Sequence, residues 1–231
     1  MKNKFQFSIF GNPNSGKTAV FNLLTGLNQK VSNYPGITVE KKSSIIKINN
    51  KDIILNDYPG SYSINSQSID ESVVQNAVLS WIDNKDSRPD AIIYVADVTN
   101  LRRNLYFFSQ LLPLDIPIVL LLNMSDLVNP NDVVNIDKLK KKFNIFDIIP
   151  FSASKRYGLE KLKSSLSLLV DSNLSEVNNN CLNLSSSNKK LLNPLFDILN
   201  RNLKLPKKIV EDLSLSIFSS ESFCNKLFFD S

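Results

Sequence analysis

The stretch FQFSIFGNPNSGKT, residues Phe5–Thr18, decides the fold of this chain. An apolar strand pattern, Phe5–Phe10, runs directly into Gly11-x-x-x-x-Gly16-Lys17-Thr18, which is the spacing of a phosphate-binding loop. The glycines let backbone N–H groups turn inward around phosphate oxygens, Lys17 supplies a positive charge to the β and γ phosphates, and the Thr18 hydroxyl can ligate Mg²⁺. A chance Gly/Lys turn is the alternative, and the preceding strand argues against it.

Composition limits the classes of protein that need to be considered. The chain has 231 residues, of which 42% are hydrophobic, and this suits one domain of ordinary size plus an appendage. The net charge of +5 is mild, and the densest basic run, Lys138–Phe143, reads as the solvent-facing side of a helix, so no nucleic-acid partner is expected. There is no histidine, and Cys181 and Cys224 lack metal-ligand spacing, which favours reduced thiols.

No targeting or membrane-spanning segment is expected in the sequence as it stands. The N-terminus leads directly into a strand pattern, and the longest apolar run, Ile116–Leu122, is far shorter than the ~20 residues that a transmembrane helix needs. The chain is therefore expected to be soluble.

Short apolar runs alternate with longer helical patterns along the first three quarters of the chain. This order predicts an α/β fold with a mostly parallel six-stranded sheet and helices on both faces. One antiparallel hairpin is expected where two runs are separated only by NNK. The predicted strands are Phe5–Phe10, Ser44–Ile48, Asp52–Asn56, Ala91–Ala96, Pro117–Leu122 and Asp147–Phe151; the predicted helices are Lys17–Thr25, Asp70–Asn84, Leu101–Leu112, Ile136–Phe143 and Leu159–Asp171.

Composition changes near Asp171, and this divides the chain into three parts. Residues 1–171 form the predicted nucleotide-binding domain. Residues 172–190 are rich in Asn and Ser and are predicted to be a linker. Residues 191–231 show helical apolar spacing and are predicted to form a small helical appendage, which is not necessarily complete.

Three further stretches carry polar groups at the ends of predicted strands. In NDYPG, Asp57 can hold Mg²⁺ through water, and the Gly60 N–H can reach a γ-phosphate. Asp and Gly are also common turn residues, but their place about 40 residues after the phosphate loop supports the functional interpretation.

The stretch NMSD, Asn123–Asp126, follows a strongly apolar strand and is predicted to read the base. The Asp126 carboxylate can accept two hydrogen bonds from guanine, whereas adenine offers neither donor, so discrimination on the order of 10⁴ is expected. In FSAS, Phe151–Ser154, the Ala153 N–H can meet the guanine O6. An ordinary polar loop after a strand is the alternative. Four such elements in the right order favour GTP and GDP as ligands.

The predicted set of nucleotide-contacting residues is drawn from these four stretches and the residue that follows Thr18. It comprises Gly11, Asn12, Pro13, Asn14, Ser15, Gly16, Lys17, Thr18, Ala19, Asp57, Gly60, Asn123, Met124, Asp126, Ser152, Ala153 and Ser154.

The quoted motifs resemble those of the ferrous-iron transporter B (FeoB) family, in its N-terminal GTPase domain. The resemblance is carried by GNPNSGKTAVFNLLTGLNQKVSNYPGITVEKK, DYPGSYSI, VADVTNLRRNLYF and IPIVLLLNMSD, and it covers about residues 5–170. It implies a P-loop GTPase fold, GTP hydrolysis that is slow and stimulated by K⁺, and a helical domain at 191–231 that supports GDP binding.

The resemblance also implies roles for individual residues. Thr38 would close on Mg²⁺ and the γ-phosphate together with Thr18 and Asp57, and Asn14 would help to bind K⁺ beside the phosphates. The catalytic set implied is Asn14, Lys17, Thr38 and Gly60. Thr38 could instead be a surface threonine, and Asn14 could only stabilise the turn of the loop. Gly60 is followed by serine, where Ras-type enzymes carry a water-positioning glutamine.

Three functions are weighed. The first, implied by the resemblance, is a GTPase that gates ferrous-iron uptake from the cytoplasmic, inner face of a bacterial membrane. Its partner would be a membrane-embedded permease region on the same or a separate chain. A small accessory protein of the same transport system and a second copy of this chain are the further partners considered. The second is a soluble ribosome- or RNA-associated GTPase, and the third is a nucleotide-binding module without turnover. Arg102 and Arg103 are interpreted as structural or exposed rather than catalytic.

Overall fold

The computed structural model describes residues 4–28, 30–34, 39–64, 68–114, 116–143 and 145–171. Thr38, both cysteines, the predicted linker 172–190 and the predicted appendage 191–231 lie outside the described residues. The strands are β1 Lys4–Gly11, β2 Lys30–Asn33, β3 Glu40–Ile48, β4 Lys51–Asp57, β5 Ala91–Asp97, β6 Ile118–Asn123 and β7 Asp147–Pro150. The α-helices are α1 Lys17–Thr25, α2 Ile69–Asp83, α3 Leu101–Leu111, α4 Pro130–Val133, α5 Ile136–Phe143 and α6 Leu159–Asp171.

The strands form one sheet in the order β2-β3-β4-β1-β5-β6-β7. The β3 strand runs antiparallel to both of its neighbours, and the other pairs are parallel. The α/β class is confirmed, but the expected count of six strands is wrong. The missed strand, β2, is exposed along its whole length and pairs only with β3, for example Lys30 with Ser43. An exposed edge strand needs no apolar alternation, so its sequence carries no strand signal.

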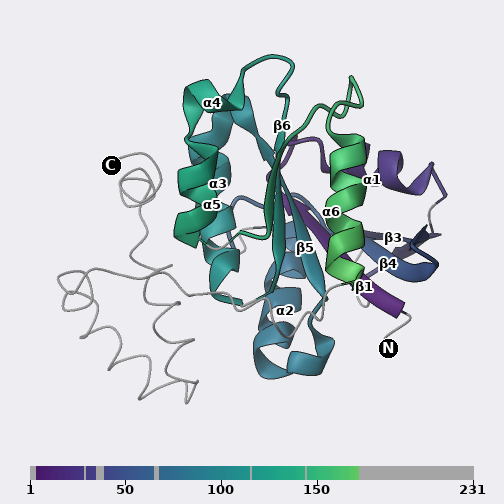
Figure 1. The fold of residues 1–231 in the computed structure, drawn as a ribbon. Coiled ribbons are helices and arrows are strands. Elements are labelled where there is room, and N and C mark those ends of the chain that lie inside the picture. The colour runs from purple at the N-terminus through teal and green to yellow at the C-terminus, as the bar shows by residue number, and fades with distance from the viewer. Residues whose placement is uncertain are drawn as a thin grey trace, which may run out of the picture.

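Helices cover both faces of the sheet, and an apolar layer lies between the sheet and the helices on each face (Figure 1). One layer packs residues such as Phe10, Ile92 and Leu120 against α2, α3 and α5, and the other packs alternate strand residues such as Ile9 and Ile93 against α1 and α6. Strands covered on both faces read as continuous apolar runs, which is why the central strands were predictable from the sequence.

The sheet order places the phosphate loop at a topological switch point. The β1 strand lies between β4 on one side and β5 on the other, with Ile9 beside both Asp57 and Ile93. After β1 the chain continues to β2, β3 and β4 on one side, and after the neighbouring β5 it continues to β6 on the other side, so the two connections diverge. A crevice outside the carboxyl ends of parallel strands at such a point is the usual ligand site.

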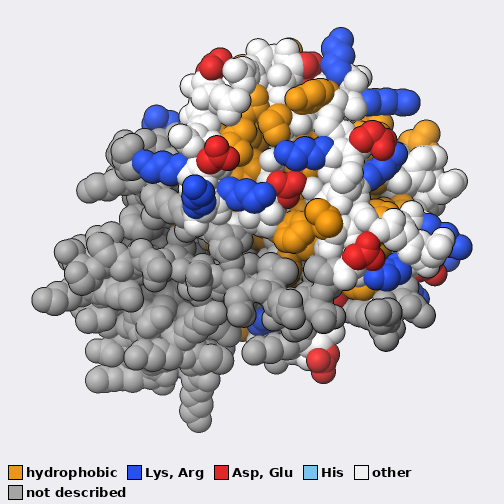
Figure 2. All heavy atoms as spheres, in the orientation of Figure 1, with side chains coloured by type: hydrophobic (Ala, Val, Ile, Leu, Met, Phe, Trp, Pro, Cys, Tyr) orange, Lys and Arg blue, Asp and Glu red, His pale blue; other side chains and the backbone are white. Residues whose placement is uncertain are grey.

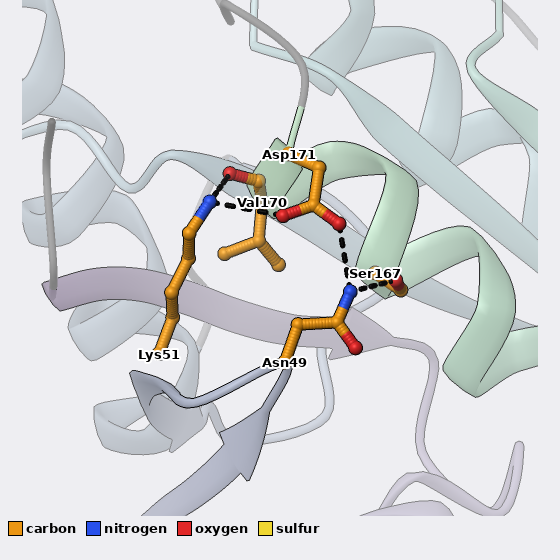
Figure 3. A network of polar contacts seen from close by, with 5 residues as sticks. All are labelled: Asn49, Lys51, Ser167, Val170 and Asp171. Atoms are coloured by element: carbon orange, nitrogen blue, oxygen red, sulfur yellow. Dashed lines mark hydrogen bonds and ion pairs between the residues drawn. The ribbon is translucent and has the colours of Figure 1, made fainter.

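The β3–β4 hairpin is confirmed, with a two-residue turn at Asn49 and Asn50. Both residues have positive φ, 49° and 60°, as a type I′ turn requires. Figure 3 shows that this turn contacts the last turn of α6: the Lys51 ammonium donates to the Val170 carbonyl at 2.7 Å and to Asp171 at 3.0 Å, and the Asn49 amide donates to Asp171 at 2.7 Å. A cation at a helix C-terminus also complements the helix dipole.

Charged side chains of both signs are interspersed on the face drawn in Figure 2. On α5, Leu139 and Phe143 are buried while Lys138 and Lys141 are exposed, so these two lysines of the basic run face solvent. Lys140 pairs with Asp147 at 3.0 Å. Within the described ranges, no helix has the length and apolar character needed to cross a bilayer.

Candidate guanine-nucleotide site

The phosphate loop follows β1 and opens α1, and neighbouring strands crowd both of its glycines. Gly11 has φ 155°, and a Cβ there would stand 2.3 Å from the Val95 carbonyl oxygen. Gly16 has φ 93°, and a Cβ there would stand 2.2 Å from the Asn123 Nδ2. Side chains are excluded at both positions, so the loop backbone can lie close to a ligand as the motif predicted.

The loop residues between the glycines have different surroundings. Asn14 is exposed and has φ 63°, so its side chain is free to face a ligand above the loop. The Asn12 side chain is only 2% exposed; its Oδ1 accepts from the Tyr94 hydroxyl at 3.0 Å, and its Nδ2 donates to the Arg103 carbonyl at 3.4 Å. Asn12 can therefore contribute its backbone to a phosphate, but its side chain holds the loop to the protein.

The end of β4 brings Asp57 and Gly60 against the loop. The Ser61 N–H donates to the Gly11 carbonyl at 3.3 Å, and a Cβ at Gly60 would stand 3.1 Å from the Lys17 Nζ. Asp57 is 8% exposed, and its Oδ1 has no hydrogen-bond partner within the part of the chain that the structure describes. An orphaned buried carboxylate oxygen near Lys17 of the loop fits a Mg²⁺ ion and its water ligands, because oxygen donors are what Mg²⁺ prefers.

Burial dominates the electrostatics of this pair. It raises the pKa of Asp57 to about 6, although the positive charges of Lys17 and Lys42 oppose the rise. It also lowers the pKa of Lys17, against the attraction of Asp57. Both groups are thus held in a site that disfavours charge until a ligand of suitable charge arrives, which is a mark of functional sites.

Asn123 joins three loops of the site. Its Nδ2 donates to the Ser15 carbonyl at 2.8 Å, and its Oδ1 accepts from the Ala153 N–H at 3.0 Å. The Ala153 N–H, which was predicted to meet the guanine O6, is thus engaged by Asn123 in this structure. This linkage fixes the distance between the phosphate loop and the predicted base-reading loops.

Asp126 is fully exposed beside the serines of the last loop. The Ser154 hydroxyl donates to its Oδ2 at 3.4 Å and lies 3.1 Å from the Ser152 hydroxyl. Hydrogen bonding from Ser152 is the largest influence that lowers the pKa of Asp126, so the group is a carboxylate at neutral pH. An ionised, exposed carboxylate supported from one side is suited to accept the two guanine donors. Met124, between Asn123 and Asp126, has φ 67° and makes the turn.

Tyr34 marks the base of the loop that holds Thr38. Its backbone N–H donates to the Val39 carbonyl at 2.9 Å, and its ring lies 6.1 Å from the Tyr58 ring, next to Asp57. The role expected of Thr38 stays a prediction, since that residue lies outside the described part of the chain. Tyr34 itself lies on the Asp57 side of the site, through its contact with the Tyr58 ring.

Two residues near the site were missed by the sequence analysis. They are Tyr94, whose hydroxyl lies 3.0 Å from Asn12 Oδ1, and Asn104, whose backbone carbonyl lies 2.7 Å from the same hydroxyl. The one usable signal was Tyr94 itself, a hydroxyl in the otherwise apolar strand AIIYVA. The Arg103 guanidinium lies 3.9 Å from the centre of the Tyr62 ring, and its backbone carbonyl accepts from Asn12 Nδ2 at 3.4 Å. The structural or exposed role expected for Arg103 stays a prediction.

Comparison with known proteins places this geometry in a family. Residues 5–166 match the family described as ferrous iron transport protein B. The chain is 37% identical over 164 residues to the Fe(2+) transporter FeoB of Escherichia coli and to that of Salmonella typhimurium; each alignment covers 71% of this chain and 21% of the relative. The alignment thus spans about a fifth of the length of these curated relatives.

Solved structures agree with the sequence match. A variant of S. thermophilus NFeoB bound to GDP is 30% identical, with a TM-score of 0.73, covering 98% of this chain and 84% of that one. The cytosolic domain of L. pneumophila FeoB is 31% identical, with a TM-score of 0.70, covering 94% of this chain and 90% of that one. From its phosphate loop, its sheet order and these matches, the chain belongs to the ferrous iron transport protein B family and contains that family's N-terminal G domain.

Proposed function

We propose that this chain binds GTP and GDP and hydrolyses GTP. The observation that carries the proposal is the Asn123 amide, which ties the phosphate loop at Ser15 to the loop at Ala153. This linkage sets a phosphate-binding loop and an exposed carboxylate, Asp126, in one continuous site. The GDP bound to the S. thermophilus relative supports the choice of ligand.

Guanine selectivity is tested at Asp126. Asp126→Ala is expected to lose most GDP affinity, because the two guanine donors would then have no partner on the protein. Asp126→Asn is expected to shift preference toward xanthine nucleotides, because the amide reverses one donor–acceptor pair. Asp132 is an exposed carboxylate on α4, and Asp132→Asn is the matched control that should leave GDP binding unchanged. Competition among GTP, ATP and XTP is the measurement, and equal ATP and GTP affinity in the unmutated protein would refute the proposal.

The hydrolytic step depends on groups that neutralise phosphate charge. Lys17 and the backbone N–H groups of the loop hold the β and γ phosphates, and the Gly60 N–H holds the γ-phosphate from the other side. Bound Mg²⁺ would add positive charge between the phosphates, held by Thr18, Thr38 and, through water, Asp57. A single-turnover GTP assay distinguishes this activity from binding without turnover: no phosphate release above the uncatalysed rate would leave only a binding module.

Potassium is proposed as a second cation, held in part by Asn14. The exposed side chain at the top of the loop and the serine after Gly60 support this, since charge is needed where other GTPases use an arginine or glutamine. Hydrolysis should be slow in NaCl and several-fold faster in KCl at matched ionic strength. Asn14→Ala should remove this difference while GDP binding stays nearly intact, and a K⁺ response that survives the substitution would assign the ion to other groups.

At the cellular level, we propose that the domain works at the cytoplasmic face of a bacterial membrane and regulates ferrous-iron uptake. The permease partner would be a membrane-embedded region on the same or a separate chain. The support is the description of the curated relatives as Fe(2+) transporters. Asp126→Ala introduced into the chromosomal gene should lower uptake of radiolabelled Fe²⁺, with Asp132→Asn as control. Unchanged uptake in cells whose purified variant has lost GDP binding would refute this role.

A further inference from the structure

A network of hydrogen bonds lies beneath the phosphate loop, within the apolar core. The Tyr94 hydroxyl, on β5, lies 3.0 Å from Asn12 Oδ1 and 2.7 Å from the Asn104 backbone carbonyl on α3. The Asn104 side chain extends this network: its Oδ1 accepts from the Asp97 N–H at 3.2 Å and its Nδ2 donates to the Asn100 carbonyl at 2.9 Å. The end of β5, the start of α3 and the loop are thus connected through hydrogen bonds that are buried at Tyr94 and partly buried at Asn104.

The hydroxyl is not needed to fill this part of the core. Tyr94 is fully buried, and its ring makes edge contacts with Phe107 at 5.8 Å and Phe108 at 5.2 Å. A phenylalanine would make the same ring contacts without burying a polar atom, and burying an unpaired hydroxyl is costly. Burial raises the pKa of Tyr94 well above its ordinary value, so the group remains a proton donor under all ordinary conditions.

Asn12 is the residue through which this hydrogen-bond network reaches the candidate nucleotide site. It follows Gly11, which is already pressed against the Val95 carbonyl, and its own backbone carbonyl accepts from the Ser15 N–H at 3.2 Å. Its side chain has two contacts: Tyr94 on one atom, and a longer bond of 3.4 Å to the Arg103 carbonyl on the other. The Tyr94 contact is the shorter of the two and involves a fully buried hydroxyl, whose single proton is shared between Asn12 Oδ1 at 3.0 Å and the Asn104 carbonyl at 2.7 Å.

We propose that Tyr94 is a positioning residue for the phosphate loop: its hydroxyl holds Asn12 so that the loop backbone keeps its phosphate-binding shape before the nucleotide arrives. The hydroxyl acts through Asn12 and does not contact the nucleotide. Without it, the buried Asn12 carbonyl lacks its donor and the loop samples other shapes, so nucleotide binding must first restore the competent one. The inference rests on the proposed binding of GDP.

Tyr94→Phe tests this, because it removes one oxygen and keeps the ring. The affinity for GDP should fall about tenfold, the size expected for one buried hydrogen bond. The loss should appear mostly as slower GDP association, because only the fraction of molecules with the competent loop shape can bind. Tyr106→Phe makes the same chemical change at another tyrosine, on α3, which does not belong to the hydrogen-bond network. This control should leave the affinity for GDP unchanged. Binding is measured with a fluorescent GDP analogue at a temperature where circular dichroism shows all variants folded.

A double-mutant cycle separates positioning from general loss of stability. In an Asn12→Ala background, the change from Tyr94 to Phe should alter the GDP affinity by less than about twofold, because its partner is gone. A full tenfold effect in that background would show that Tyr94 acts by another route, and an unchanged affinity for Tyr94→Phe alone would likewise overturn the inference. Failure of the unmutated protein to bind GDP would instead contradict the proposed function.

Discussion

Asp57 gives a stability prediction whose sign is the reverse of the usual one for an acid. The fold raises its pKa from 3.8 to about 6, chiefly because burial penalises the charged form. The folded protein therefore holds the proton more tightly than the unfolded chain does. Stability from this group is fully present below about pH 4, declines as the pH rises through about 6, and is absent above it. The rise corresponds to about 3 kcal/mol.

Asp57→Asn should accordingly stabilise the nucleotide-free, Mg²⁺-free protein at pH 8 by up to about 3 kcal/mol, because the neutral amide avoids the cost of a buried charge. This free energy already includes the opposing attraction of Lys17 and Lys42, because both charges contribute to the same pKa of Asp57. At pH 4.5 the native carboxyl is mostly protonated, so most of the gain should disappear. The same substitution should weaken Mg²⁺-dependent nucleotide binding.

Urea unfolding in EDTA at pH 8 and pH 4.5 measures both effects. Asp147→Asn is the matched control with the opposite sign. Burial works to raise the pKa of Asp147, but hydrogen bonds from Ser165 and Lys140 and the charge of Lys140 outweigh it and hold the pKa below its usual value. Asp147→Asn should therefore destabilise the protein at pH 8, and less at low pH. If Asp57→Asn lowered stability at pH 8, or changed it equally at both pH values, the reasoning would be wrong.

Three further predictions follow from other contacts. Gly16→Ala should weaken GDP binding at least about tenfold in a titration, because its φ of 93° and the amide 2.2 Å from its Cβ both resist a side chain; affinity equal to that of the unmutated protein would contradict this. Lys51→Met should speed amide exchange in the last turn of α6, because its bond to Asp171 is lost. Residues Asn28–Glu40 and Asp57–Asp70 should gain exchange protection when a non-hydrolysable GTP analogue replaces GDP, and equal protection would exclude a switch.

The local sequence was sufficient wherever one contiguous pattern decides the structure. The phosphate loop was predictable because its glycines, lysine and threonine are consecutive along the chain and follow an apolar strand. The bounds of α1, α5 and α6 were also predicted as they are observed, since an apolar stripe at helical spacing must be buried wherever the helix packs. The hairpin between β3 and β4 followed from two apolar runs around a short polar turn, although the strands are longer than predicted.

The strand β2 and the polar connections beneath the site were decided only by tertiary structure. Lys30–Asn33 is a strand because β3 offers its edge, and nothing in four exposed residues indicates this. Tyr94 and Asn12 are 82 positions apart, and Asn123 and Ser15 are 108 apart, so no local pattern connects them. The sequence by itself predicted which backbone turns and charges would face a nucleotide. Their spacing was decided by the sheet order, because only the packed sheet brings the carboxyl ends of β1, β4, β5 and β6 to one edge.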